Sequence, residues 1–287
     1  MITVLFHGKV YVRTPHVRRI FWKRKMMVQL RVQIYEIQEP EEAEALLDLG
    51  VHCIGSVLVS AEDWKIPAIR KVIDCVKRRS GQSSLIPLFS EQDQIFRAID
   101  WYQPDVIHLC ENLTITQGDI LGDLIRLQEA VKKNYPNLKI MRSIPIGETG
   151  KANRVPTLDL ARRFEPVSDL FLTDTLIVSQ GGTDKEQPVH GFVGITGQTC
   201  DWGMARKLVE QSRLPVILAG GLSPGNVFEA AVTTLPAGVD SCTQTNQVDQ
   251  TGKPIRFKKD LEKVKTFVKE ALRAEMTMLK KQDTLKK

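Results

Sequence analysis

A pair of glycines after an apolar run offers the clearest chemistry in this sequence. Residues 214–219 are apolar enough for a buried strand, and Gly220 and Gly221 follow directly. Glycine tolerates positive φ and has no Cβ, so backbone N–H groups in such a turn can approach an anion closely. Ser223 suits a helix N-cap and Pro224 the first helical position, which would direct the positive end of the next helix to the same place. The pattern predicts phosphate binding, and the alternative is an ordinary tight connection between a strand and a helix.

Such a turn needs strands and helices that place it at one end of a sheet. Short apolar runs alternate with longer amphipathic segments along the chain, which is typical of βα units and a parallel sheet. The expected strands are 30–35, 53–59, 85–89, 106–109, 139–144, 170–173, 191–195, 216–219 and 238–241. The expected helices are 40–49, 66–76, 94–101, 120–133, 202–211, 226–233 and 259–281. Nine strands are one too many for a barrel of eight, so the run at 191–195 is either a barrel strand or part of the loop after Asp174.

The length of the chain fits this architecture. A (β/α)8 barrel, or TIM barrel, of about 250 residues uses almost all of the 287 residues, and no second domain is required. We expect a single α/β barrel over residues 28–272. Residues 1–27 are expected to form a basic extension outside the fold, and residues 273–287 the basic end and tail of the last helix.

Positive charge is concentrated at the amino terminus. The net charge is +6, but residues 1–27 hold seven of the 40 basic residues and none of the 34 acidic ones. The remaining 33 basic and 34 acidic residues give the rest of the chain a charge of about −1. The sequence therefore predicts no nucleic-acid groove on the barrel.

Cysteine, histidine and hydropathy patterns exclude several other classes of protein. The five cysteines form no C-x-x-C pair, which favours reduced thiols in the cytoplasm. No apolar run approaches the length of a membrane span, and the five histidines show no spacing typical of a zinc site. We therefore expect no metal, no cofactor and no membrane association.

Four segments in order carry a more specific signal. They are residues 32–57, which include Gln33-Ile-Tyr-Glu-Ile37, then Phe171-Leu-Thr-Asp-Thr175, Gly194-Ile-Thr-Gly-Gln-Thr-Cys-Asp-Trp202, and Leu218-Ala-Gly-Gly-Leu-Ser-Pro-Gly-Asn-Val227. Together they resemble the phosphoribosylanthranilate isomerase family, TIM-barrel enzymes of tryptophan synthesis. The resemblance covers roughly residues 28–272 and is more specific in the second half.

The resemblance implies an Amadori rearrangement. In this reaction a general acid protonates the ribose ring oxygen, and a general base removes the C2 proton to give an enolamine and then a ketone. Asp174 matches the general acid. Tyr35 stands where the family has its general-base cysteine, and the neighbouring Glu36 replaces a glycine, so Glu36 or Tyr35 is expected at the base position. An unperturbed phenol near pKa 10 is a poor base at neutral pH.

The resemblance also implies a substrate site around these groups. The phosphate is expected on the loops that carry Gly197, Gly220, Gly221, Ser223 and Thr243. Lys65, His108 and Arg142 are expected in the substrate pocket, with Lys65 supplying a positive charge where the family has an arginine that binds the anthranilate carboxylate. His108 has an equally good interpretation as a hydrogen-bonded core residue.

The leading hypothesis is a phosphoribosylanthranilate isomerase-like enzyme, an aldose–ketose isomerase, that acts in the cytoplasm as a monomer or homodimer on a small phosphorylated substrate. A second hypothesis is a diverged isomerase or lyase for another phosphorylated sugar. A third, from a different class, is a non-catalytic barrel that binds a phosphorylated metabolite or a protein partner.

Overall fold

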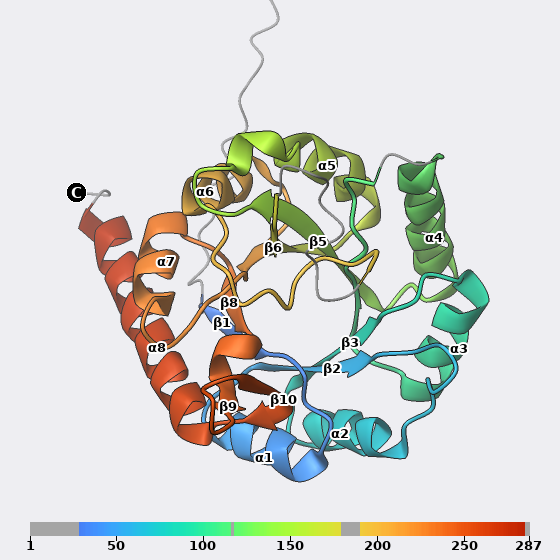
Figure 1. Ribbon diagram of the computed structural model, residues 1–287, viewed down its shortest axis with the longest axis horizontal. Helices are drawn as coiled ribbons and strands as arrows, with labels where there is room; N and C mark the ends of the chain where they lie inside the picture. The colour runs from blue at the N-terminus through green and yellow to red at the C-terminus, as the bar shows by residue number, and fades with distance from the viewer. Residues whose placement is uncertain (1–28, 116–117, 179–189, 285–287) are drawn as a thin grey trace, which may run out of the picture.

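The protein forms a closed barrel of eight parallel strands, seen end-on in Figure 1. The computed structural model describes residues 29–115, 118–178 and 190–284. The barrel strands are β1 (Arg31–Ile34), β2 (Cys53–Leu58), β3 (Gln82–Pro87), β4 (Val106–Leu109), β5 (Lys139–Gly147), β6 (Leu170–Leu176), β7 (Val216–Leu218) and β8 (Gly238–Ser241). Each pairs with its neighbours in sequence, and β1 closes the barrel by pairing with β8, with Gln33 opposite Asp240.

Helices surround the barrel on all sides (Figure 1). They are α1 (Pro40–Asp48), α2 (Pro67–Arg78), α3 (Gln92–Tyr102), α4 (Ile120–Asn134), α5 (Thr157–Phe164), α6 (Trp202–Gln211), α7 (Val227–Thr234) and α8 (Leu261–Thr284). Three short 3₁₀ helices lie in the connections, namely η1 (Ala152–Arg154), η2 (Glu165–Val167) and η3 (Thr243–Thr245). The predicted single (β/α)8 barrel is confirmed.

A two-stranded hairpin is inserted between β8 and α8. Its strands, β9 (Asn246–Val248) and β10 (Pro254–Lys259), are antiparallel and lie near α1 in Figure 1. This hairpin was not predicted from the sequence. It brings Arg256 to the end of β1 and Lys259 to the end of β8, where the site is built.

Successive side chains along a strand face alternately outward and inward. They therefore divide the apolar residues between the layer under the helices and the interior of the barrel. Val32 and Ile34 of β1 face outward and pack against α8 and α1, as part of the largest core cluster. Gln33 and Tyr35 face inward, since Gln33 bonds Asp240 across the β1–β8 seam and Tyr35 packs with Val57 inside the barrel. Side chains therefore fill the barrel interior, and the space for a ligand lies above them at the carboxyl ends of the strands.

Residues 191–195 form no barrel strand; Phe192 makes a single antiparallel bridge with Glu111, so this run is part of the loop after β6. The last helix begins at Leu261 and continues to Thr284, slightly beyond the predicted span. The predicted extension over residues 1–27 lies outside the described residues.

No helix within the described ranges is long and apolar enough to cross a membrane.

Candidate functional site

A small cavity lies where the loops after β6, β7 and β8 meet. Four of the predicted phosphate-binding residues line it, namely Gly197, Gly220, Gly221 and Thr243. The backbone N–H groups of the three glycines donate no hydrogen bond to any other residue that the structure describes. Free amides that converge on a cavity are the donors that a phosphate group requires. We call this space the phosphate cavity.

The glycines are required by how closely the loops pack. Gly220 has φ +90°, and a Cβ at this position would lie 2.4 Å from Oγ1 of Thr175. Gly221 has φ +60°, and a Cβ there would lie 2.5 Å from the carbonyl carbon of Gln198. Both the backbone conformation and the available space therefore exclude a side chain at the turn.

Ser223 is the predicted phosphate-binding residue that lies outside the phosphate cavity. The following helix, α7, begins at Val227 rather than at Pro224, and Ser223 does not line the phosphate cavity. Asn226 explains the difference, because its Oδ1 accepts a hydrogen bond from the Ser223 N–H at 2.7 Å and its Nδ2 donates to the Gly221 carbonyl at 3.1 Å. The side chain of Asn226 thus stabilises a turn that delays the helix and holds the diglycine in place.

Asp174 lies inside the barrel mouth at the end of β6 and lines the phosphate cavity. The Thr175 N–H donates to its Oδ1 at 2.9 Å, and Gly194 packs against its other oxygen, because a Cβ at Gly194 would lie 2.1 Å from Oδ2. Burial raises the pKa of Asp174 to about 7, and the hydrogen bond from Thr175 opposes this shift. A large fraction of this carboxyl is therefore protonated near neutral pH, as a general acid requires.

A second, mainly apolar cavity adjoins the first on the other side of Asp174. Its apolar lining consists of Val57, Ile86, Leu88, Leu172, Val193 and Ile195. Its acidic lining residues are Glu36, Asp174 and Asp240, and no lysine or arginine among the described residues lines it. We call this space the apolar cavity.

Tyr35 lies at the floor of the apolar cavity, at the predicted base position. Its hydroxyl is held 2.5 Å from Ser84 Oγ and 2.7 Å from Nδ1 of His108, and its ring covers Gly55 so closely that a Cβ there would collide with it. Burial raises the pKa of Tyr35 well above 10. The phenol is therefore protonated at neutral pH, which does not favour Tyr35 as the base.

Glu36 has left the strand and adopts φ +66°, a conformation that side chains other than glycine rarely take. Its Oε1 accepts hydrogen bonds from Nε of Arg256 at 2.7 Å and lies 2.5 Å from Nη2 of the same side chain. Its Oε2 has no hydrogen-bond partner and essentially no accessible surface. The predicted base is thus buried and held by the hairpin.

Asp240 is a third carboxyl group in the site, and sequence reasoning did not assign it a role. It lies on β8, lines both cavities and is 6% exposed. Nε2 of Gln33 donates to its Oδ1 at 3.0 Å. Burial raises its pKa to about 7, the Gln33 hydrogen bond opposes the shift, and the charge of Asp174 adds to it. One feature of the sequence could have identified Asp240. It is an acidic residue in a buried strand, just before the predicted phosphate loop that begins at Cys242.

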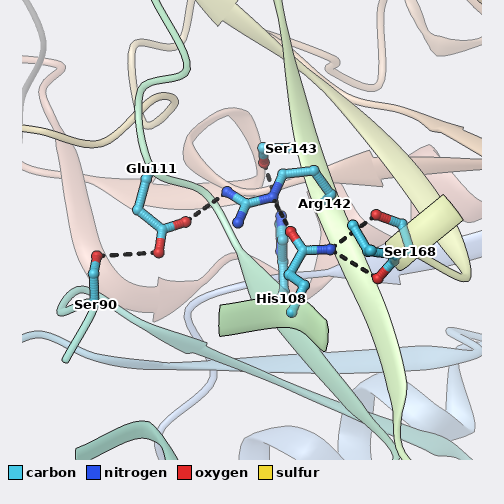
Figure 2. Close-up of polar contacts among 8 residues, drawn as sticks. Ser90, His108, Glu111, Arg142, Ser143 and Ser168 are labelled. Carbon is cyan, nitrogen blue, oxygen red and sulfur yellow. Dashed lines mark hydrogen bonds and ion pairs between the residues drawn. The ribbon is translucent and has the colours of Figure 1, made fainter. Parts of the chain in front are cut away.

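Arg142 does not lie in the predicted pocket. Its side chain points outward from β5 into the layer of helices, as Figure 2 shows, where Nη1 donates to Glu111 at 2.6 Å and Nε to Gln128 at 2.7 Å. The guanidinium carbon lies 4.9 Å from the ring centroid of Phe164. Because Met141 and Ser143 face the barrel interior, Arg142 between them has to face the helices.

Of the two other residues predicted in the substrate pocket, His108 lines the apolar cavity and Lys65 does not. Lys65 is exposed, and its Nζ lies 5.4 Å from the Trp101 ring centroid, outside both cavities. His108 lines the apolar cavity as predicted and also bonds Ser143 through Nε2 at 2.8 Å. Burial and the nearby Arg142 lower the pKa of His108 to about 3, so its ring is neutral and supplies no cation to the cavity.

Two further features of the described residues limit the choice of site. No group of three or more His, Cys, Asp or Glu side chains within them could hold a metal ion. A wider groove lies at the amino-terminal end of the strands, near Arg31 and Lys139, but it contains none of the predicted site residues. Proton-transfer groups are therefore concentrated at the carboxyl end, as in other barrels of this type.

Comparison with known proteins gives a consistent result. The family described as N-(5'-phosphoribosyl)anthranilate (PRA) isomerase matches residues 123–270. The N-(5'-phosphoribosyl)anthranilate isomerase of Methanocella arvoryzae is 34% identical over 84% of this chain and 97% of its own length. The phosphoribosyl anthranilate isomerase of Thermotoga maritima has the same fold, with a TM-score of 0.61 at 19% identity over 85% of this chain and all of its own. A similar structure, with a TM-score of 0.59 at 18% identity and covering 85% of this chain and all of its own, is in complex with reduced 1-(o-carboxyphenylamino)-1-deoxyribulose 5-phosphate.

Proposed function

The chain belongs to the N-(5'-phosphoribosyl)anthranilate isomerase family, and from this membership we propose that it is itself an isomerase of tryptophan biosynthesis that converts an N-glycoside of ribose 5-phosphate to the 1-amino-1-deoxyketose. The observation that carries the proposal is the position of Asp174. This carboxyl, whose pKa is raised to about 7, lies between a cavity lined by free backbone amides and a mainly apolar cavity.

The two cavities suit the two ends of such a substrate. The phosphate would bind the N–H groups of Gly197, Gly220 and Gly221, which are already free. The aromatic amine would occupy the apolar cavity, between side chains such as Val57 and Leu172. The ribose would then lie beside Asp174. Binding energy from the phosphate end would hold the reacting atoms in place.

Asp174 would act as the general acid. Its proton would pass to the ribose ring oxygen as the bond from that oxygen to C1 breaks, and the nitrogen lone pair would form the C1=N bond. Removal of the C2 proton then gives the enolamine. For this step the family resemblance offers Glu36 or Tyr35, the two residues at the base position, and both line the apolar cavity.

A second candidate function is the same rearrangement of a glycoside whose amine lacks a carboxylate. No basic side chain of the described residues lines the apolar cavity, and Lys65 lies outside it. A carboxylate buried there without a cation would be costly. The comparison that separates the two candidates is the turnover of phosphoribosylanthranilate against its aniline analogue.

The proposal includes a reaction without metal or cofactor, carried out in the cytoplasm by a monomer or homodimer. It is tested by following the loss of phosphoribosylanthranilate fluorescence with the wild-type chain and with Asp174→Asn. We expect turnover by the wild type and a loss of about 10²–10⁴-fold in the variant, the usual contribution of a positioned acid. Rescue of a tryptophan auxotroph by the wild type but not by Asp174→Asn gives the same answer in cells. Turnover of neither glycoside by the wild type contradicts the proposal.

A further inference from the structure

The ribose of a bound substrate has to cross the junction between the two cavities. If the phosphate occupies one cavity and the amine the other, the ring oxygen and C2 lie where the cavities meet. The residues that line both cavities are Asp174, Ile195, Asp240 and Cys242. Glu36 lines only the apolar cavity. The acceptor of the C2 proton should therefore be sought among the groups at the junction.

Two of these four residues do not suit the role. Ile195 has no ionisable group. Burial raises the pKa of the Cys242 thiol, and the carboxylates of Glu36 and Asp240 raise it further against the opposing effect of Lys259. The thiol therefore stays protonated at neutral pH and is a poor base, although it directly follows β8, the strand that neighbours β1. Asp240 is the one remaining partner for Asp174 at the junction.

The oxygens of Asp240 and Glu36 differ in how a substrate could reach them. Gln33 occupies Oδ1 of Asp240, whereas Oδ2 makes no hydrogen bond to a described residue and keeps some accessible surface. In Glu36, Oε1 is taken by Arg256, and Oε2 has essentially no accessible surface. Glu36 would have to leave its ion pair with Arg256 to approach a sugar, whereas Asp240 has no ion pair to break.

We propose that Asp240 is the general base of this chain and forms the acid–base pair with Asp174, an inference that rests on the proposed function. The family's first-strand thiol would thus be replaced by a carboxylate on the neighbouring strand β8, at the register position opposite Gln33. Glu36 instead anchors the hairpin through Arg256.

The protons balance over one cycle. Asp174 gives its proton to the ring oxygen, and Asp240 takes the proton from C2 while the C2–H electron pair forms the C1=C2 bond and the C1=N pair returns to nitrogen. Asp240 then returns its proton to C1, and the proton of the C2 hydroxyl restores Asp174 as the ketone forms. The net result is an isomerisation, and both carboxyl groups recover their starting states.

The electrostatic surroundings suit this division of roles. Both carboxyls have a pKa of about 7, raised chiefly by burial, so one can hold a proton while the other accepts one near neutral pH. The titratable or charged groups around Asp240 are Tyr35 after β1, Cys53 on β2, Asp174 on β6, Cys242 after β8 and Lys259 on β10. Because Asp174 and Asp240 interact, their two apparent pKa values describe the pair of carboxyls rather than either one alone. We expect the activity to show a narrow maximum close to pH 7.

The decisive experiment measures the pH dependence of kcat/KM for the wild type, Asp240→Asn and Glu36→Gln. Activity should rise as the base loses its proton and fall as the acid loses its own, giving a bell in the wild type. Asp240→Asn is expected to lower kcat by about 10²–10⁴-fold and to remove the acidic limb of the bell. Glu36→Gln should lose less than about tenfold and keep both limbs. Binding of reduced 1-(o-carboxyphenylamino)-1-deoxyribulose 5-phosphate, which needs no catalysis, should change little in Asp240→Asn.

Gln33→Met provides a second test that keeps both carboxyls. It removes the hydrogen bond that lowers the pKa of Asp240, so the acidic limb should move to higher pH. This test also decides the matter if Asp240→Asn does not fold.

The proposal is overturned if Asp240→Asn keeps more than a tenth of wild-type kcat, or if Glu36→Gln alone abolishes the acidic limb. An unchanged limb in Gln33→Met also counts against it. Each of these results leaves the isomerase function standing, whereas a wild-type chain without turnover removes both.

Discussion

Three carboxyl groups within one barrel mouth differ in what surrounds them. Asp174 accepts one backbone hydrogen bond, Asp240 accepts one from Gln33, and Glu36 is paired with Arg256. A paired carboxylate is suited to anchoring, because the ion pair stabilises its charged form. A buried carboxyl without a cation is suited to proton transfer. The chemistry of each residue is therefore set by its neighbours rather than by its type.

The raised pKa of Asp240 predicts a cost in stability that depends on pH. Below its ordinary value of 3.8 the carboxyl is protonated in both the folded and the unfolded chain. Between 3.8 and about 7 the unfolded chain releases the proton while the folded chain retains it, so the free energy of unfolding falls as pH rises. The loss is about 1.4 kcal/mol per pH unit and reaches about 4 kcal/mol at most.

Asp240→Asn should remove this loss, because an amide at 240 can still accept the Gln33 hydrogen bond and never ionises. Urea unfolding at pH 4 and pH 8 measures the effect. We expect the variant to resemble the wild type at pH 4 and to be more stable by a few kcal/mol at pH 8. An equal difference in stability between the variant and the wild type at pH 4 and at pH 8 would show that the carboxyl of Asp240 does not titrate as described.

At the scale of elements, the β9–β10 hairpin determines the conformation of the chain after β1. Arg256 on β10 reaches Glu36, and Lys259 donates from Nζ to the Cys242 carbonyl at 2.9 Å, while its own N–H donates to Glu42 at 2.6 Å. These contacts connect the end of β1, the end of β8 and helix α1. The hairpin is therefore part of the scaffold of the site.

Arg256→Ala should destabilise the protein, because it leaves the Glu36 carboxylate buried without a cation. The Arg256 side chain is 40% exposed, so we expect a loss of about 1–3 kcal/mol rather than the larger cost of a fully buried pair. Adding Glu36→Gln should restore part of the loss, and a double-mutant cycle in urea measures the coupling. Additive losses would mean that the ion pair does not hold the hairpin.

Within the described residues, the sequence predicted the eight barrel strands and seven of the eight helices but missed helix α5 and the hairpin. The Trp202–Gln211 helix and the strands Val106–Leu109 and Gly238–Ser241 have the predicted bounds. Helix α5 was missed, although α7, which also has eight residues, was predicted at 226–233. The hairpin was missed because its residues are mostly exposed and carry little apolar alternation.

The site was predicted only in part from the sequence. Asp174 and the glycine turns follow strand ends, and the order of strands alone places them at one rim. Arg142 was misplaced because β5 is buried on both faces, so its residue types do not reveal which side chains face inward. Asp240 was missed because its importance comes from Gln33 and Asp174, which are distant in sequence.

At the scale of the whole molecule, the barrel is maintained while its chemistry is rearranged. The Thermotoga maritima enzyme shares the fold at only 19% identity. A closed barrel has no free strand edge, and its interior is filled by side chains that support one another from opposite strands. Such a scaffold holds eight strand ends at fixed positions. A catalytic group can therefore be replaced by one on the next strand, as we infer for β1 and β8, without a change of fold.

Gly238 is a tightly packed residue at the seam where β1 and β8 close the barrel. Gly238 stands opposite Arg31, and a Cβ there would lie 2.7 Å from the Arg31 carbonyl oxygen and 2.8 Å from Cδ1 of Ile217. Gly238→Ala should force the two strands apart where the barrel closes. We expect a loss of about 1–3 kcal/mol in the free energy of unfolding, typical of an overpacked core.

Gly225→Ala is the matched control, because a Cβ at 225 would make only an ordinary contact, 3.7 Å from Ser223 Oγ. It should change stability by less than about 0.5 kcal/mol. Urea unfolding of both variants, followed by circular dichroism and by tryptophan fluorescence, measures the difference.

Because Asp240 lies two residues beyond Gly238 on β8, opening the seam should also move the proposed base. Gly238→Ala should therefore lose activity even at temperatures where it remains folded, whereas wild-type activity in a destabilised variant would show that the seam supports the fold but not the site.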